Sequence, residues 1–202
     1  MMEGELRKLV LVKSIFLHAC SHADAGDEID RVLAIHHFDF VVEMILKCIA
    51  TKRNIISSAR HELKFKDLWN AIVQRNVDLP LRVRMFELHD ARNLVQHAGI
   101  IPSLEDVRAF KGYVESFLEQ VLEREFGISF DELSLAQLIQ NSDLRKMVQN
   151  AENLFKDGKY KDCIQLCGEV LAKATFDIAE IFGKAGLLTA YFGAAEELKR
   201  VI

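Results

Sequence analysis

Residues 88–107 read LHDARNLVQHAGIIPSLEDV. Gly99 is typical of the residue that ends a helix, because glycine reaches left-handed backbone angles without strain. Ser103 can cap a new helix, and Asp106 follows it at the spacing of a capping box. The stretch therefore predicts that one helix, over residues 82–98, ends here and that another begins after a short link.

The helix predicted over residues 82–98 carries an unusual set of polar residues on one half of its surface. At about 100° per residue, that half holds His89, Arg92, Asn93, Gln96 and His97, and the other half holds Leu88, Ala91, Leu94, Val95 and Ala98. Arginine and amide side chains bind phosphates, and histidine can move a proton near neutral pH. A solvated helix face would more commonly carry Lys and Glu. The sequence therefore predicts a functional site here.

Helical patterns continue on both sides of this stretch. Toward the N-terminus, apolar spacing predicts helices over residues 3–22, 28–51 and 65–75. Asp27 is suited to cap the second of these, and Trp69 is predicted to anchor the core from the third. The inner side of the helix over residues 28–51 is predicted to hold Ile29, Val32, Leu33, His36, Phe40, Val41, Ile45 and Ile49.

Toward the C-terminus, a long helix is predicted to run to about residue 125 and to end at Gly127. Only two prolines interrupt the whole chain. These patterns predict an all-α fold, with an antiparallel helical bundle over residues 1–127.

A second, smaller helical region is predicted over residues 130–202. Residues 151–174, AENLFKDGKYKDCIQLCGEVLAKA, resemble one tetratricopeptide-type helical hairpin. The positions at which that repeat has its large, turn and small residues are occupied here by Leu154, Phe155, Gly158, Tyr160 and Cys163. A further helix is predicted from Ile178 to Ile202. It ends without a stop signal, so we expect the sequence to be part of a longer protein.

Composition limits the compartment and the partners. The longest apolar runs are too short to cross a membrane, which takes about 20 residues, and the N-terminus lacks the pattern of a secretion signal. A cytoplasmic protein without membrane contact is expected.

The net charge is −4, yet residues 52–92 hold nine Lys or Arg against five acids. This excess either faces nucleic acid or is ordinary surface charge, and the sequence favours neither reading.

No metal or cofactor is predicted. Cys163 and Cys167 lie one helical turn apart, and a zinc site usually needs four ligands, so reduced and mostly buried thiols are expected for all four cysteines. His18, His36 and His37 lie in the apolar N-terminal helices and are predicted to be hydrogen-bonded core or surface residues.

The pattern Arg-polar-x-x-x-His, here RNLVQH at residues 92–97 followed by Ala98-Gly99, resembles the motif of HEPN domains (higher eukaryotes and prokaryotes nucleotide-binding). The similarity covers residues 1–126. It implies a bundle of four or five helices and a two-fold dimer that brings two Arg-His sets together. It also implies metal-independent cleavage of single-stranded RNA to a 2′,3′-cyclic phosphate, carried out by Arg92 and His97.

The resemblance assigns Asn93 as the polar residue of the motif. Because Asn93 and His97 are four residues apart, the amide is predicted to orient the imidazole or to touch the same phosphate. Helical geometry adds His89 and Gln96 as RNA-binding residues, and the basic segment adds Arg84. Arg92 and His97 lie about 140° apart around the helix, so they are predicted to flank a groove.

Three functions remain open from the sequence. The first is a ribonuclease of toxin or anti-phage defence type, held in check by an antitoxin or another regulatory protein. The second is a non-catalytic helical module that binds a nucleotide or a protein through the same polar face. The third is a dimerisation unit with a purely structural role.

Overall fold

The computed structural model describes residues 3–56 and 63–184, and within these residues the chain is all-α, as predicted. It divides into two compact units, residues 1–138 and 139–202. None of the described helices is both long enough and apolar enough to cross a membrane.

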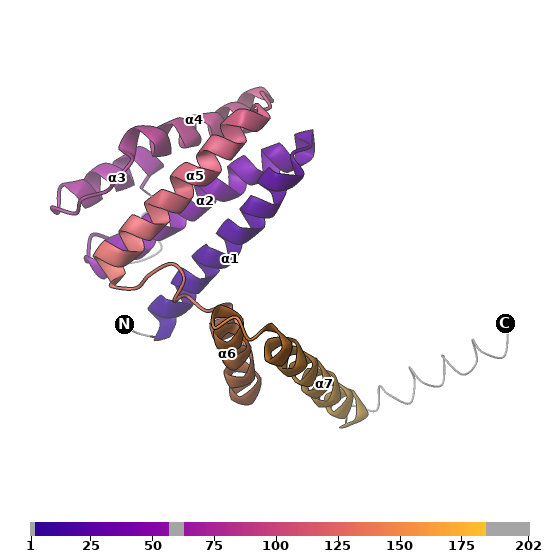
Figure 1. Ribbon diagram of the computed structural model, residues 1–202. Helices are drawn as coiled ribbons and strands as arrows, with labels where there is room; N and C mark the ends of the chain where they lie inside the picture. The colour runs from indigo at the N-terminus through magenta and orange to yellow at the C-terminus, as the bar shows by residue number, and fades with distance from the viewer. Residues whose placement is uncertain (1–2, 57–62, 185–202) are drawn as a thin grey trace. The chain divides into compact units, whose positions relative to one another are not determined.

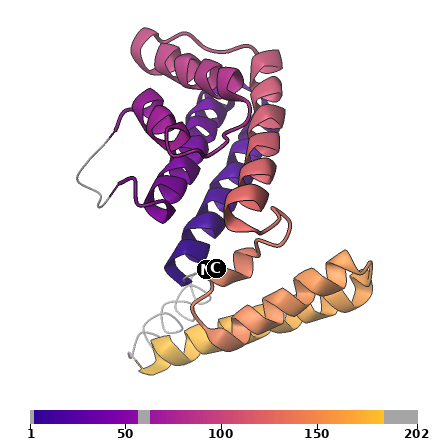
Figure 2. The same ribbon diagram turned by 90° about the vertical axis from the view of Figure 1, so that its left-hand side faces the viewer.

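The first unit is a helical bundle built around α2 (Figures 1 and 2). Its helices are α1 (Glu3–Ala25), α2 (Glu28–Lys52), α3 (Phe65–Val73), α4 (Arg82–Ala98) and α5 (Leu104–Val121). A π-helical turn, Leu122–Phe126, continues α5, and a 3₁₀ turn, Leu135–Leu138, completes the unit. Helix α2 packs against α1, α3, α4 and α5, so most of its length is enclosed.

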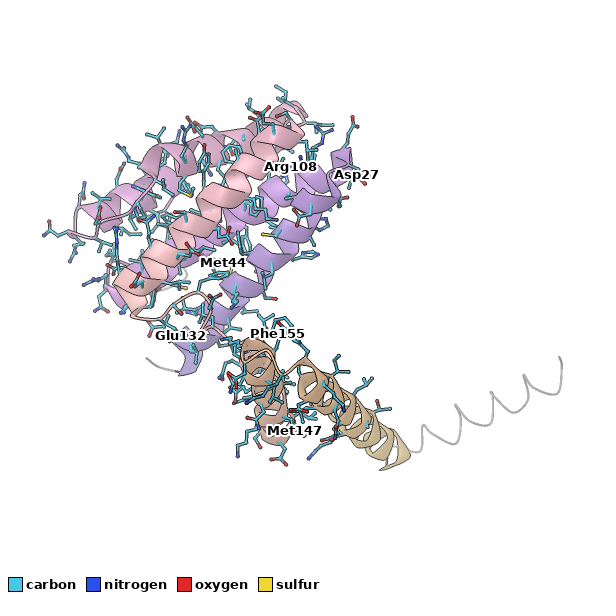
Figure 3. The ribbon with its side chains drawn as sticks, viewed as in Figure 1. Asp27, Met44, Arg108, Glu132, Met147 and Phe155 are labelled. Atoms are coloured by element: carbon cyan, nitrogen blue, oxygen red, sulfur yellow. The ribbon has the colours of Figure 1, made fainter. Side chains whose placement is uncertain are left out.

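Three helix ends lie where capping residues predict them. Asp27 directly precedes α2 (Figure 3). Its side chain accepts a hydrogen bond from the backbone N–H of Asp30 at 2.8 Å. Ser103 accepts one from the N–H of Asp106 at 3.0 Å. Gly99 ends α4 with φ +66°, the left-handed angle expected of a C-terminal glycine. Gly99 and Ser103 therefore set the C-terminal end of the motif helix and the start of its successor.

One apolar core fills the first unit. Trp69 is fully buried, as predicted, and lies against Phe117 at 5.7 Å and Phe86 at 5.6 Å between ring centroids. Leu133, which follows the π-helical turn, is also buried in this core. The segment after the turn therefore belongs to the bundle.

The predicted inner side of α2 is partly wrong. Ile29 and Phe40 are exposed, whereas the buried residues are Ala34, Ile35, Phe38, Asp39, Val41, Val42, Ile45, Leu46, Cys48, Ile49 and Ala50. Helices surround α2 on several sides, so its buried residues do not follow the single stripe of a half-exposed helix. Phe38 and Asp39 face the core in place of Phe40.

The second unit is a helical hairpin formed by α6 (Ser142–Lys156) and α7 (Tyr160–Lys184). Gly158 turns the chain between them with φ +73°, and the rings of Phe155 and Tyr160 meet edge to face at 5.5 Å. Helix α7 continues through Ile178, so the separate helix predicted from that residue begins inside α7. The rest of that prediction, residues 185–202, lies outside the described residues.

Candidate functional site

The site is centred on Asp39, which is 1% exposed and is the one charged residue buried as a whole among the described residues. It lies in the middle of α2, between Phe38 and Phe40. A carboxylate removed from water needs charged or hydrogen-bonding partners, because an unpaired buried charge is strongly unfavourable. Those partners come from α4, the motif helix.

Two side chains of α4 reach Asp39, one to each carboxylate oxygen. The Nε of Arg92 donates to Oδ2 at 2.7 Å, and the Nδ1 of His89 lies 2.9 Å from Oδ1. A carboxylate paired with a guanidinium only accepts hydrogen bonds, so His89 carries its proton on Nδ1. The His89 ring also stacks on Phe65, with centroids 4.3 Å apart and planes 7° apart. His89 is therefore fixed by packing and by hydrogen bonding together.

Arg92 continues this network to two amides of its own helix. Its Nη1 donates to Oδ1 of Asn93 at 3.0 Å and to Oε1 of Gln96 at 2.9 Å. The Nη2 group makes no hydrogen bond with any described residue, and the side chain keeps 22% of its surface exposed. Arg92 is thus held rigidly while one end of its fork remains available to an anion.

His97 stands apart from this network. It lies exposed in the last turn of α4 and makes no hydrogen bond or ion pair with the described part of the chain. The predicted contact between Asn93 and His97 is absent, because the Asn93 oxygen accepts from Arg92 instead. Within the described residues, no hydrogen-bond or ion-pair partner thus fixes the imidazole.

The apolar half of α4 also differs from the simple two-sided prediction. Met85 and Leu88 are its buried residues, whereas Leu94 is 49% exposed. Ile100 and Ile101, directly after the helix, are exposed as well. The end of the motif helix therefore presents apolar side chains next to His97 in sequence.

Arg84 does not join the Asp39 network. It pairs with Glu87 at 2.8 Å and lies over the Tyr113 ring, 5.0 Å from its centroid. Both side chains of this ion pair are well exposed. The hydrogen bond from Arg84 to Glu87 raises the pKa of the guanidinium, so the charge is permanent but already partnered.

Other cations of the basic segment are partnered too. Lys66 pairs with Asp90 at 3.0 Å, and Arg53 holds Glu125 through two nitrogens, at 3.0 and 2.8 Å. Arg60 lies outside the described residues. The positive excess of this segment is thus partly neutralised by neighbouring carboxylates.

The histidines of the N-terminal helices depart from prediction at one position. His37 was expected to be hydrogen-bonded, yet its buried Nδ1 has no hydrogen-bond partner among the described residues. Burial and the neighbouring imidazoles of His18, His22 and His36 lower the pKa of His37, so its ring is neutral at pH 7.

Sequence reasoning missed Asp39. A signal was available, since an acid lies within the apolar run Phe38-Asp39-Phe40-Val41-Val42 in the middle of a helix. Such a residue must find a partner on a neighbouring helix. Its partner, however, could be named only once α2 and α4 were known to pack together.

Comparison with known proteins adds no relative: no protein-family model, no curated protein and no solved structure matches this chain.

Proposed function

We propose that this chain is a cytoplasmic, metal-independent endoribonuclease of HEPN type, which cleaves single-stranded RNA as a toxin or in defence against phage. The observation that carries the proposal is Arg92 held by the buried Asp39, with Nη2 available for a phosphate, in the same short motif as the exposed His97. Guanidinium and imidazole are the groups that such a reaction needs.

The proposed reaction needs two histidines. One His97 takes the proton from the ribose 2′-hydroxyl, and the resulting oxygen attacks the neighbouring phosphorus. The bond to the 5′-oxygen breaks, and that oxygen receives a proton from a second imidazole, which leaves a 2′,3′-cyclic phosphate. Arg92 binds the phosphate oxygens, where negative charge builds up.

A homodimer supplies the second imidazole. One motif helix offers a single His97, and a two-fold axis near the end of α4 would place the partner subunit's His97 opposite it. The exposed Leu94, Ile100 and Ile101 support this proposal, because apolar residues near the motif favour association. An antitoxin or other regulatory protein that covers the same surface would hold the activity in check.

The test is cleavage of single-stranded RNA in EDTA by the unaltered protein and by His97→Ala. Because His97 is exposed and makes no hydrogen bond with the described residues, the substitution is expected to change the free energy of unfolding by less than about 0.5 kcal/mol. Cleavage should fall at least about 100-fold, the usual contribution of a general acid–base. Arg108→Ala, an exposed cation on α5, is the matched control and should cleave normally.

Cleavage by His97→Ala at the unaltered rate would contradict the proposal. Sedimentation of the active protein should show a dimer, and activity confined to a monomer would contradict the shared site.

The alternative is a non-catalytic module that binds a nucleotide or a protein through the same face. It is favoured by one observation: Asp39 neutralises the charge of Arg92, and Asn93 and Gln96 are already engaged. This function predicts no RNA turnover but a rise in melting temperature with the bound partner. RNA binding should weaken steeply with salt if phosphates are contacted.

A further inference from the structure

Three histidines converge between α1 and α2, in the same unit as the Asp39 network. His18 and His22 are one turn apart on α1, and His37 comes from α2. The ring centroids lie 4.6 Å apart for His18 and His22, 5.0 Å for His18 and His37, and 5.6 Å for His22 and His37. One ring nitrogen from each lies within 4.8 Å of the others.

The first sign that this cluster binds a ligand is that the imidazole of His37 has an unpaired ring nitrogen, Nδ1. This atom is buried without a hydrogen-bond partner among the described residues, although leaving a buried polar atom unpaired is unfavourable. His22 and His18 supply only further ring nitrogens at this place. Three imidazoles are chemically suited to bind one metal ion, because each neutral ring has one nitrogen whose lone pair can be donated to it.

The second, independent sign is a carboxylate behind the cluster. Oδ1 of Asp30 lies 2.6 Å from Nδ1 of His22. Metal-binding histidines commonly donate their other ring N–H to a carboxylate, which fixes the tautomer and strengthens the ligand. With its proton on Nδ1 toward Asp30, His22 has the lone pair of Nε2 available for a metal.

We propose that His18, His22 and His37 bind one divalent transition-metal ion, of which Zn²⁺ is the natural candidate. Imidazole suits zinc, and three histidines leave a fourth tetrahedral position for water. His18 is exposed, so that position can face solvent. Metal–nitrogen bonds of about 2.0–2.1 Å place ligand atoms about 3.3 Å apart, which small side-chain rotations can reach from the present spacing.

The site would link α1 to α2 rather than act on RNA. It is independent of the proposed ribonuclease activity, because that activity is measured in EDTA with the metal removed. Failure of the metal proposal would leave the RNA assay untouched, and the reverse also holds.

The test is a titration of untagged, metal-free protein with ZnCl₂, followed by calorimetry and thermal unfolding. One ion should bind per chain, and at a hundred-fold excess over the dissociation constant the melting temperature should rise by about 5 °C or more. His18→Ala should lower the affinity at least about 100-fold. Asp30→Asn should lower it about 10- to 100-fold, as expected of a residue behind a ligand.

Two controls keep the result specific. His36→Gln alters a neighbouring histidine outside the cluster and should bind zinc as the unaltered chain does. Cys163→Ser with Cys167→Ser removes the thiol pair of the second unit and should also leave binding unchanged.

Because His18 is exposed, His18→Ala should fold normally, and its far-ultraviolet circular dichroism verifies this. Undiminished zinc affinity in that variant would overturn the proposal. Loss of binding in the cysteine variant, or the absence of saturable binding to the unaltered chain, would overturn it as well.

Discussion

Asp39 and Glu87 each pair with an arginine of α4, but their surroundings differ. Asp39 is 1% exposed, whereas Glu87 and Arg84 are each 47% exposed. Water can replace the lost partner of Glu87 but cannot reach Asp39. The same kind of ion pair therefore has different consequences at the two places.

Arg92→Ala is expected to lower the free energy of unfolding by about 3 kcal/mol, because among the described residues it leaves the buried carboxylate with His89 as its one side-chain partner. Arg84→Ala is the matched control, and it should cost less than about 1 kcal/mol, as exposed ion pairs do. Urea unfolding of both variants measures the difference. Equal losses would show that Asp39 is not sealed from water.

The sequence predicts which residues lie on the same helix. It does not predict which residues face each other across two helices. Arg92 and His97 drew attention because such residues are unusual on a solvated helix. Asp39 is 53 positions away from Arg92, and only the packing of α2 on α4 brings them together. The missing contact between Asn93 and His97 has the same cause, since the competing partner is oriented by Asp39.

At the scale of elements, a glycine in a turn can be compared with a glycine inside a helix. Gly26 joins α1 to α2 with φ +75°, and a Cβ there would lie 3.0 Å from Cδ1 of Leu104. Gly112 lies within α5, and nothing is within 4 Å of the place where its Cβ would stand. The backbone angle and the close neighbour thus favour glycine at position 26, whereas position 112 has room for a side chain.

Gly26→Ala should destabilise the protein by about 1–3 kcal/mol, since the left-handed angle and the contact with Leu104 both oppose a side chain. Gly112→Ala should instead stabilise it by about 0.5–1 kcal/mol, because alanine favours the helix interior. Thermal unfolding should move in opposite directions for the two variants. A shared direction would contradict this account of the turn.

The elements themselves were the most predictable part of the fold. Asp27, Ser103 and Gly99 act through their immediate neighbours, so their positions sufficed to place helix ends. The inner face of α2 was less predictable because packing on several sides hides its periodicity. The π-helical turn Leu122–Phe126 was expected only as the end of an ordinary helix.

At the scale of the whole molecule, the cysteines report on the integrity of the two units separately. Cys48 is buried in the bundle, and burial raises its pKa to about 11. Cys167 is exposed on α7. A raised pKa keeps the Cys48 thiol protonated, and hence unreactive, until the pH approaches 11 or the bundle opens.

Alkylation with iodoacetamide at pH 8 should therefore modify Cys167 quickly and Cys48 only as the first unit unfolds. Mass spectrometry of peptides after timed alkylation gives both rates. Adding urea should accelerate the reaction of Cys48 far more than that of Cys167. Rapid modification of Cys48 in the native protein would contradict its burial.

The short turn at Gly26 bears on the order in which the molecule assembles. Only Gly26 and Asp27 separate α1 from α2, so bringing these two helices together costs little loop-closure entropy. We expect this pair to form early in folding and to serve as the template on which more distant segments dock. Arg92 lies far along the chain from this helix pair. We therefore expect its ion pair with Asp39 to form only after α1 and α2 have packed together.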